Sequence, residues 1–431
     1  MRKRWSRERS QSQATDFYSH SDLGELSTYE ADANGTSVYS TQYSRDALGR
    51  ITEKAESVSG ESHTYDYNYH LAGRLTEAMT DGTPTAHYDY DANSNRIGGF
   101  NQQGSITASY DDQDRMLTSG SATYTYTANG ELLTKTDSTG TTTYSYDVLG
   151  NLMAVTLPDG TQIGYVLDGK TRRIGKKVNG TLMQGFLYDG QLRIVAELDG
   201  ASNVVSRFIY GSKPNVPDYM IRGGAMYRIV SDQLGSPRLV VNAADGSVAQ
   251  RMDYDEFGNV LVDTSPGFQP CGFAGGLYDR DTTLVRSGAR DYDPQTGRWT
   301  TKDLVGLGPA TANLYTYLLN DPLNSADPTG NGVGAFLACS AINVQDAIST
   351  INELKDLSDE LALIQRQLAI ARSHLDDSCQ ANQDLAAQVI EDLTQRQLQI
   401  IARQATDHLK LIVLNGAVEL ACGVTLPIPG F

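Results

Sequence analysis

The sequence predicts a mainly β protein: a ribbon of antiparallel β-hairpins, followed by a C-terminal antiparallel α-helical hairpin. Two observations predict the ribbon. Tyr-x-Tyr segments recur about every twenty residues, and most are followed by an Asp-x-x-Gly turn or a close variant of it. The helical hairpin is predicted by one observation. After Gly334, the spacing between apolar residues changes from two residues to alternating three and four residues.

The composition supports strands and tight turns. The chain has 431 residues, enough for two or more domains, and contains 24 Tyr against 9 Phe together with 41 Gly. Its net charge of −17 argues against a nucleic-acid partner, since no basic face would neutralise phosphates.

Each repeated unit is expected to form a half-buried strand, a turn and a returning strand. Examples are "YSRDALGRI" from residue 43, "YNYHLAGRL" from 67 and "YSYDVLGNL" from 144. Such a unit cannot bury its apolar face alone, so neighbouring units must stack. Aligned on the glycine of the turn or its substitute, the units have these positions: Gly49, Gly73, Ser94, Asp114, Gly130 and Gly150.

This pattern resembles the YD repeat of the Rhs and teneurin-like family. Later stretches follow the Rhs-associated core of that family in order, among them "DQLGSPRLVVNAADGSVAQRMDYDEFGNVL" from 232, "GFAGGLYDRDTTLVRSGARDYDPQTGRW" from 272 and "NLYTYLLNDPLNSADPTG" from 313. The resemblance implies a spiralling β-sheet shell that encloses a chamber in longer relatives, with a variable C-terminal region that is often a toxin. We expect this chain, with its few hairpins, to cap such a shell and to need an upstream shell or delivery module.

With this resemblance, four parts can be assigned along the chain. Residues 1–38 form a leader or partial repeat, and residues 39–210 carry the YD repeats. Residues 211–331 correspond to the Rhs-associated core, and residues 332–431 to the variable C-terminal region.

Two aspartates, Asp303 and Asp327, are candidates for catalysis. Two neighbouring carboxylates can share a proton and activate water against an amide, but aspartates in turns are more often only turn formers. The resemblance implies an intramolecular aspartic protease in which Arg290 orients or balances both acids. Cleavage is then expected near Asn331–Gly332.

Two positions of this sequence differ from the usual motif of the family. Leu304 stands where the family usually has proline, and Asn331 stands where leucine is common.

Other kinds of site have less support. The six histidines form no cluster with metal-ligand spacing, and the sequence has no G-x-S-x-G motif. We therefore expect neither a metal nor a cofactor.

The C-terminal region is expected to form two helices joined near "DDSCQANQD". The first helix carries an a/d seam, and the second spans about residues 385–414. Cys339 and Cys422 flank the helices at the same end, so they are the expected disulfide in an oxidising compartment. The seam consists of Leu354, Leu357, Leu361, Ile364, Leu368, Ala371 and Leu375.

The function predicted from these features is that of a shell fragment that encloses or caps its C-terminal region and releases it by autoproteolysis. A polymorphic-toxin or interbacterial-competition context would make that region the cargo and add an immunity protein as a partner. The apolar helical stripes also favour a homo-oligomer. Because no Sec signal peptide is visible, we expect a cytoplasmic stage and then non-Sec export to the surface or medium.

Two alternatives remain open at this stage. The first is a non-enzymatic secreted or surface module that binds carbohydrate or protein through its tyrosines. The second is a membrane-acting effector that resides in residues 332–431.

Overall fold

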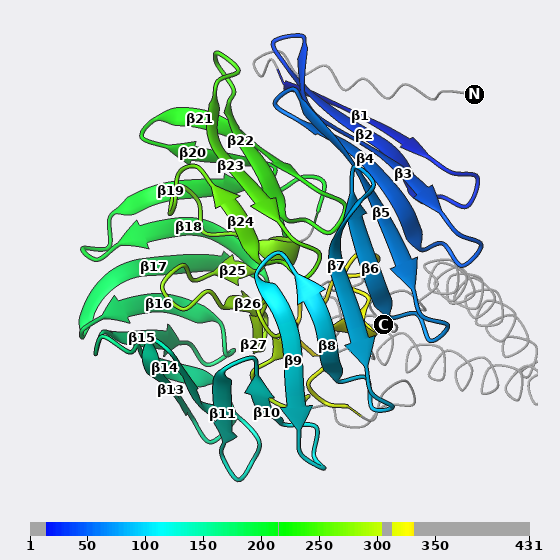
Figure 1. Ribbon diagram of the computed structural model, residues 1–431. Helices are drawn as coiled ribbons and strands as arrows, with labels where there is room; N and C mark the ends of the chain where they lie inside the picture. Colours follow the sequence, from blue (N-terminus) through cyan, green and yellow to red (C-terminus); the bar gives the residue numbers. More distant parts are fainter. Residues whose placement is uncertain (1–13, 214, 304–312, 332–431) are drawn as a thin grey trace, which may run out of the picture. The chain divides into compact units, whose positions relative to one another are not determined.

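The first 24 strands form one antiparallel meander in the computed structural model, which describes residues 14–213, 215–303 and 313–331. Each strand pairs with the next along the chain (Figure 1). The expectation of a mainly β fold of hairpins is confirmed. The strands are β1 (Ala14–His20), β2 (Leu26–Ala33), β3 (Thr36–Arg45), β4 (Ile51–Val58), β5 (Glu61–Tyr69), β6 (Leu75–Thr80), β7 (Thr83–Tyr90), β8 (Arg96–Asn101), β9 (Gly104–Tyr110), β10 (Met116–Ser119), β11 (Ala122–Tyr126), β12 (Leu132–Asp137), β13 (Gly140–Tyr146), β14 (Leu152–Thr156), β15 (Gln162–Leu167), β16 (Arg173–Val178), β17 (Thr181–Asp189), β18 (Arg193–Asp199), β19 (Val204–Ile209), β20 (Tyr219–Arg222), β21 (Ala225–Ser231), β22 (Pro237–Asn242), β23 (Val248–Tyr254) and β24 (Val260–Asp263).

In most of the repeats an aspartate closes the turn. Asp46 Oδ1 accepts hydrogen bonds from the backbone N–H groups of Leu48 and Arg50, at 2.9 and 3.0 Å, and Asp46 Oδ2 accepts from Arg50 Nε at 2.7 Å. Gly49 between them has a φ of +79°, which glycine adopts without steric cost. Equivalent turns are closed by Asp91, Asp111, Asp147, Asp168, Asp199 and Asp255.

The second tyrosine of the repeat connects neighbouring hairpins. Tyr90 donates its hydroxyl hydrogen to the carbonyl oxygen of Leu75, at 2.7 Å, and the Arg74 guanidinium lies 5.0 Å from the centre of the Tyr90 ring. A buried carbonyl at the start of each returning strand is thereby satisfied by the following hairpin. The same bond joins Tyr69 to Ile51, Tyr110 to Arg96, Tyr188 to Arg173 and Tyr210 to Ile194.

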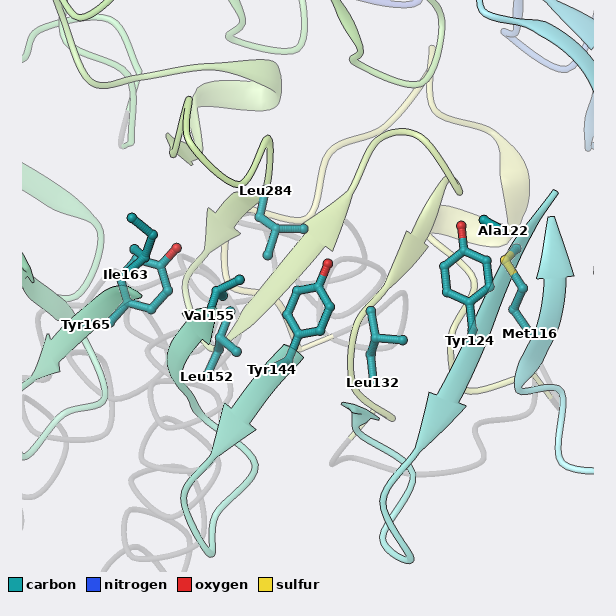
Figure 2. Packing of buried hydrophobic residues seen from close by; sticks show 10 residues of the cluster. All are labelled: Met116, Ala122, Tyr124, Leu132, Tyr144, Leu152, Val155, Ile163, Tyr165 and Leu284. Atoms are coloured by element: carbon teal, nitrogen blue, oxygen red, sulfur yellow. The ribbon is translucent and has the colours of Figure 1, made fainter. Parts of the chain in front are cut away.

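Residues 268–303 and 313–331, here called the inner segment, pack against strands from along the whole ribbon. Leu284 lies in one apolar cluster with residues of β10–β15, among them Val155 and Tyr144 (Figure 2). Leu323 packs with β3–β9, and Leu277 packs with β17–β22. The inner segment therefore supplies the core that the hairpins cannot build by themselves.

The inner segment has its own small sheet, which consists of β25 (Leu277–Tyr278), β26 (Val285–Ser287), β27 (Arg290–Asp293) and β28 (Arg298–Trp299). Two 3₁₀ turns flank the sheet, η1 (Phe273–Gly275) and η2 (Leu318–Asn320). An aromatic cluster of Phe273, Tyr292, Trp299 and Tyr317 holds these pieces together.

The first and last parts of the ribbon pack face to face. A buried apolar cluster joins β2–β4 to β21 and β22, whose strands converge near the top of Figure 1. Three ion pairs cross the same seam: Arg228–Asp16 at 2.8 Å, Arg238–Glu56 at 2.8 Å and Arg251–Glu61 at 2.6 Å. Within the described residues β1 pairs only with β2 and β24 only with β23, so side-chain packing makes this contact, not strand pairing.

Part of the sequence-based expectations falls outside the described residues. The C-terminal helical hairpin, the Cys339–Cys422 disulfide and Leu304 cannot be compared with the structure. The described residues belong to one unit that extends from Met1 to Gly334. No helix within them is long and apolar enough to cross a membrane.

Replacing Tyr90 by phenylalanine tests the bond between hairpins. The Leu75 carbonyl would lose its partner, so the free energy of unfolding should fall by about 1–2 kcal/mol. Urea denaturation followed by far-UV circular dichroism measures the change. Tyr278→Phe is the control, because its hydroxyl has no hydrogen bond to the described residues, and an equal loss there would contradict the assignment.

Glu256, which is buried in the β23–β24 turn, should make stability pH-dependent. Burial and the neighbouring Asp255 carboxylate raise the pKa of Glu256 to about 7, against the favourable effect of Lys54. Since this pKa is raised in the folded state, the stability from the neutral acid is present below about pH 4.5 and is lost as the pH rises through about 7.

Glu256→Gln removes this titration. Relative to the variant, the wild type should lose roughly 2–3 kcal/mol of stability between pH 4.5 and pH 7.5. Urea unfolding of both proteins at several pH values measures the difference. A constant difference across this range would show that Glu256 has an ordinary pKa.

Candidate active site

Arg290, Asp303 and Asp327 lie together in the inner segment. Arg290 begins β27, Asp303 follows β28, and Asp327 lies in the final turn before Gly330. Arg290 Nη2 is 3.1 Å from Asp303 Oδ2 and 3.6 Å from Asp327 Oδ2. One nitrogen therefore contacts both carboxylates.

The Arg290 side chain is held on three sides. Its Nε donates to the carbonyl oxygen of Gly330 at 2.5 Å, and its guanidinium lies over the Trp299 ring, 4.1 Å from the ring centre. The side chain is only 2% exposed. Burial lowers the pKa of Arg290, while Asp303 and Asp327 act in the opposite direction. Its Nη1 group is buried and has no hydrogen-bond partner among the described residues.

The two carboxylates have different surroundings. Asp327 is 2% exposed, and its Oδ1 accepts hydrogen bonds from Thr329 Oγ1 at 2.9 Å and from the Gly330 backbone at 3.0 Å. These bonds fix Asp327 and leave Oδ2 facing Arg290. Asp303 is 16% exposed, and its backbone N–H donates to the Leu314 carbonyl at 3.0 Å. Water can therefore reach the pair from the side of Asp303.

A close backbone crossing brings the end of the inner segment to Arg290. The Ala289 N–H donates to the Thr329 carbonyl at 2.8 Å. Gly330 has a φ of +64°, and a Cβ atom there would lie 2.1 Å from the carbonyl oxygen of Ser287. Only glycine fits this position. Its carbonyl, which belongs to the peptide bond before Asn331, consequently points at the guanidinium.

A neighbouring arginine, Arg298, has a structural role. Arg298 Nη1 donates to Asn95 Oδ1 at 2.8 Å, and Arg298 Nη2 donates to the Asp114 carbonyl. The guanidinium also lies over the Tyr110 and Tyr315 rings. It joins β28 to the turns of the ribbon.

Some site residues were not found from the sequence. Thr329 and Gly330 belong to the "DPTG" motif, and Trp299 lies in "GRW", but their contacts with Asp327 and Arg290 could not be inferred from spacing. At the expected cleavage position, the Asn331 N–H donates to Thr329 Oγ1 at 3.3 Å, and Gly332 lies outside the described residues.

The arrangement supplies parts for acid–base chemistry at an amide. Two carboxylates and one guanidinium carry one net negative charge, which a single proton would neutralise. In the part of the chain that the structure describes, no group of three or more His, Cys, Asp or Glu side chains is arranged to hold a metal ion.

Two solved structures match about three quarters of this chain. The crystal structure of TcdB2-TccC3-TEV matches with a TM-score of 0.35 and 17% identity, covering 74% of this chain and 21% of that one. A Tc holotoxin pore structure of Photorhabdus luminescens, with the mutation TccC3-D651A, matches with a TM-score of 0.34 and 15% identity, covering 73% and 21%.

Relatives with higher identity are teneurins. Teneurin-3 of Danio rerio is 30% identical over 293 residues, which are 65% of this chain and 11% of the relative. Teneurin-1 of Homo sapiens is 30% identical over 292 residues, or 64% and 10%. The chain thus spans about a tenth of the length of these relatives. The family model for the teneurin YD-shell matches residues 2–323. The chain therefore belongs to the teneurin YD-shell family.

Proposed function

We propose that this YD-shell domain cleaves its own chain near Asn331–Gly332 and so separates residues 332–431 from the shell. The contact of one buried guanidinium with two carboxylates carries this proposal. The Gly330 carbonyl on the same guanidinium adds to it, because the chain entering the expected cleavage position is already fixed beside the acids.

The chemistry follows from the charges of the site. With one proton shared between them, one carboxylate takes a proton from water and the other gives its proton to the leaving nitrogen. The water oxygen bonds to the carbonyl carbon of Asn331, the bond to the Gly332 nitrogen breaks, and a carboxyl group and an amine result. Arg290 Nη1, which lacks a partner among the described residues, is suited to donate to the oxygen that becomes negative.

In this proposal the shell carries residues 332–431 as a cargo that cleavage releases. An interbacterial toxin context, export to the medium or surface, an immunity protein and an upstream shell module belong to the same proposal. Its support is the family, the position of Asp327 just before residue 332, and the contact of Arg290 with both Asp327 and Asp303. The helical pattern of residues 354–375 is compatible with a small cargo.

The carbohydrate-binding alternative has less support. It needs exposed tyrosine rings that can stack on sugars. Among the described residues, Tyr18 is the exposed tyrosine, and its ring stacks on Tyr29 at 4.6 Å. The other tyrosines of the described repeats are buried or half-buried, so autoproteolysis is our first proposal.

Intact-mass spectrometry of the purified chain tests the proposal directly. The wild type should give two fragments that meet near residue 331, whereas Asp303→Asn and Asp327→Asn should each stay whole. Asp321→Asn is the matched control, since Asp321 also precedes a proline in the inner segment, and it should cleave like the wild type. A wild type that stays whole after long incubation would show that both aspartates serve only structure here.

Arg290→Lys tests the role of the guanidinium. Lysine keeps the charge but cannot contact the Gly330 carbonyl and both carboxylates at once. Cleavage of freshly synthesised chain, followed on gels over time, should slow by about 100-fold or more. Near-UV circular dichroism, to which the neighbouring Trp299 contributes, serves as the control for folding. An unchanged rate in a folded variant would remove Arg290 from the mechanism.

A further inference from the structure

A cavity of about 490 Å³ lies at the seam where the first and last parts of the ribbon pack together. We call it the seam cavity. Its walls come from β4, β5 and β22–β24 with the turn between β23 and β24. Residues that line it include Lys54, Glu56, Tyr67, Arg238, Asp253 and Glu256. Its volume is in the range of small-molecule binding sites.

The cations of the seam cavity already have anionic partners. Arg238 contacts Glu56 at 2.8 Å and Asp253 at 2.7 Å. Arg251 contacts Asp253 at 2.9 Å and Glu61 at 2.6 Å, and Lys54 contacts Glu56 at 3.3 Å. Lys54, Arg238 and Arg251 are therefore all paired with other carboxylates, and none of them forms an ion pair with Glu256.

Two other acids in the wall are satisfied by the turns that they close. Asp232 Oδ1 accepts hydrogen bonds from the backbone N–H groups of residues 234, 235 and 236, at 2.8–3.0 Å. Asp255 accepts from the backbone of Phe257 and Asn259 and from the Asn259 side chain. Both carboxylates are therefore part of the repeat architecture.

Glu256 differs from every other acid of the seam cavity. Its side chain belongs to a residue only 8% exposed, yet no cation of the described residues lies within ion-pair distance. It accepts one hydrogen bond from another residue, the Tyr88 hydroxyl, at the long distance of 3.4 Å to Oε2, and one from its own backbone N–H. Burying a carboxylate without a charged partner costs free energy, so such groups are rare in an ordinary protein core. An unpaired carboxylate in the wall of a cavity is therefore a candidate for binding a cationic ligand.

We infer that the seam cavity binds a small organic cation whose ammonium or guanidinium group donates hydrogen bonds to Glu256. A single unpaired carboxylate suits one such group, whereas Ca²⁺ or Mg²⁺ would take several oxygen ligands. The rings of Tyr65, Tyr67 and Phe273 in the wall favour an organic cation further. This inference is independent of the proposed autoproteolysis.

Isothermal titration of the purified protein with cadaverine at pH 8 tests the inference. Glu256 is ionised at this pH, so cadaverine should bind the wild type with 1:1 stoichiometry. Glu256→Gln should bind at least about tenfold more weakly, because it loses a charge-assisted hydrogen bond. Glu77→Gln is the matched control, since Glu77 is 48% exposed and lies outside the seam cavity.

Two further ligands complete the experiment. 1,5-Pentanediol has the same length as cadaverine without its charge, and it should not bind. A blocked tripeptide with a central lysine shows whether the cation comes from a free amine or from a protein side chain, and binding of either supports the inference. It is overturned if neither amine binds, if the diol binds equally well, or if Glu256→Gln keeps the wild-type affinity.

Discussion

The buried carboxylate of Asp291 is the contact on which the arrangement of the inner segment depends. It accepts hydrogen bonds from Arg173 on the ribbon, at 2.8 Å, and from Arg286 on the neighbouring strand, at 2.9 Å. All three side chains are at most 4% exposed. Removing one partner of such a buried group typically costs about 3–5 kcal/mol. Because Asp291 fixes β27 against β16, it also decides where the preceding residue of the strand can point.

That preceding residue is Arg290. Successive side chains of a strand point to opposite faces, so Asp291 faces the ribbon while Arg290 faces Asp303 and Asp327. The ion pairs of Asp291, one residue away, thus fix the position of the Arg290 guanidinium independently of any substrate. Such pre-organisation is what an electrostatic site needs, because its donors do not have to be rearranged during the reaction.

The repeat explains how the ribbon can pack around an inner segment that contains buried charges as well as apolar residues. Aspartates close the turns with bonds inside five residues, and tyrosine hydroxyls satisfy carbonyls of the preceding hairpin. The ribbon therefore satisfies many of its own polar groups locally. Its inner face can then accept buried arginines such as Arg298, which bonds to Asn95 and to the turn at Asp114. The seam cavity arises where the last hairpins meet the first.

The sequence by itself determined the hairpins, their order and their turns, since these depend on bonds between residues close along the chain. It also indicated Arg290, Asp303 and Asp327, although only through a family resemblance. The tertiary structure decided that these three side chains meet, that Gly330 crosses β27, and that Glu256 is left without a cation. Those contacts join residues far apart in the chain, and their distances depend on how the whole ribbon packs around the inner segment. The local repeat pattern of the sequence does not determine these distances.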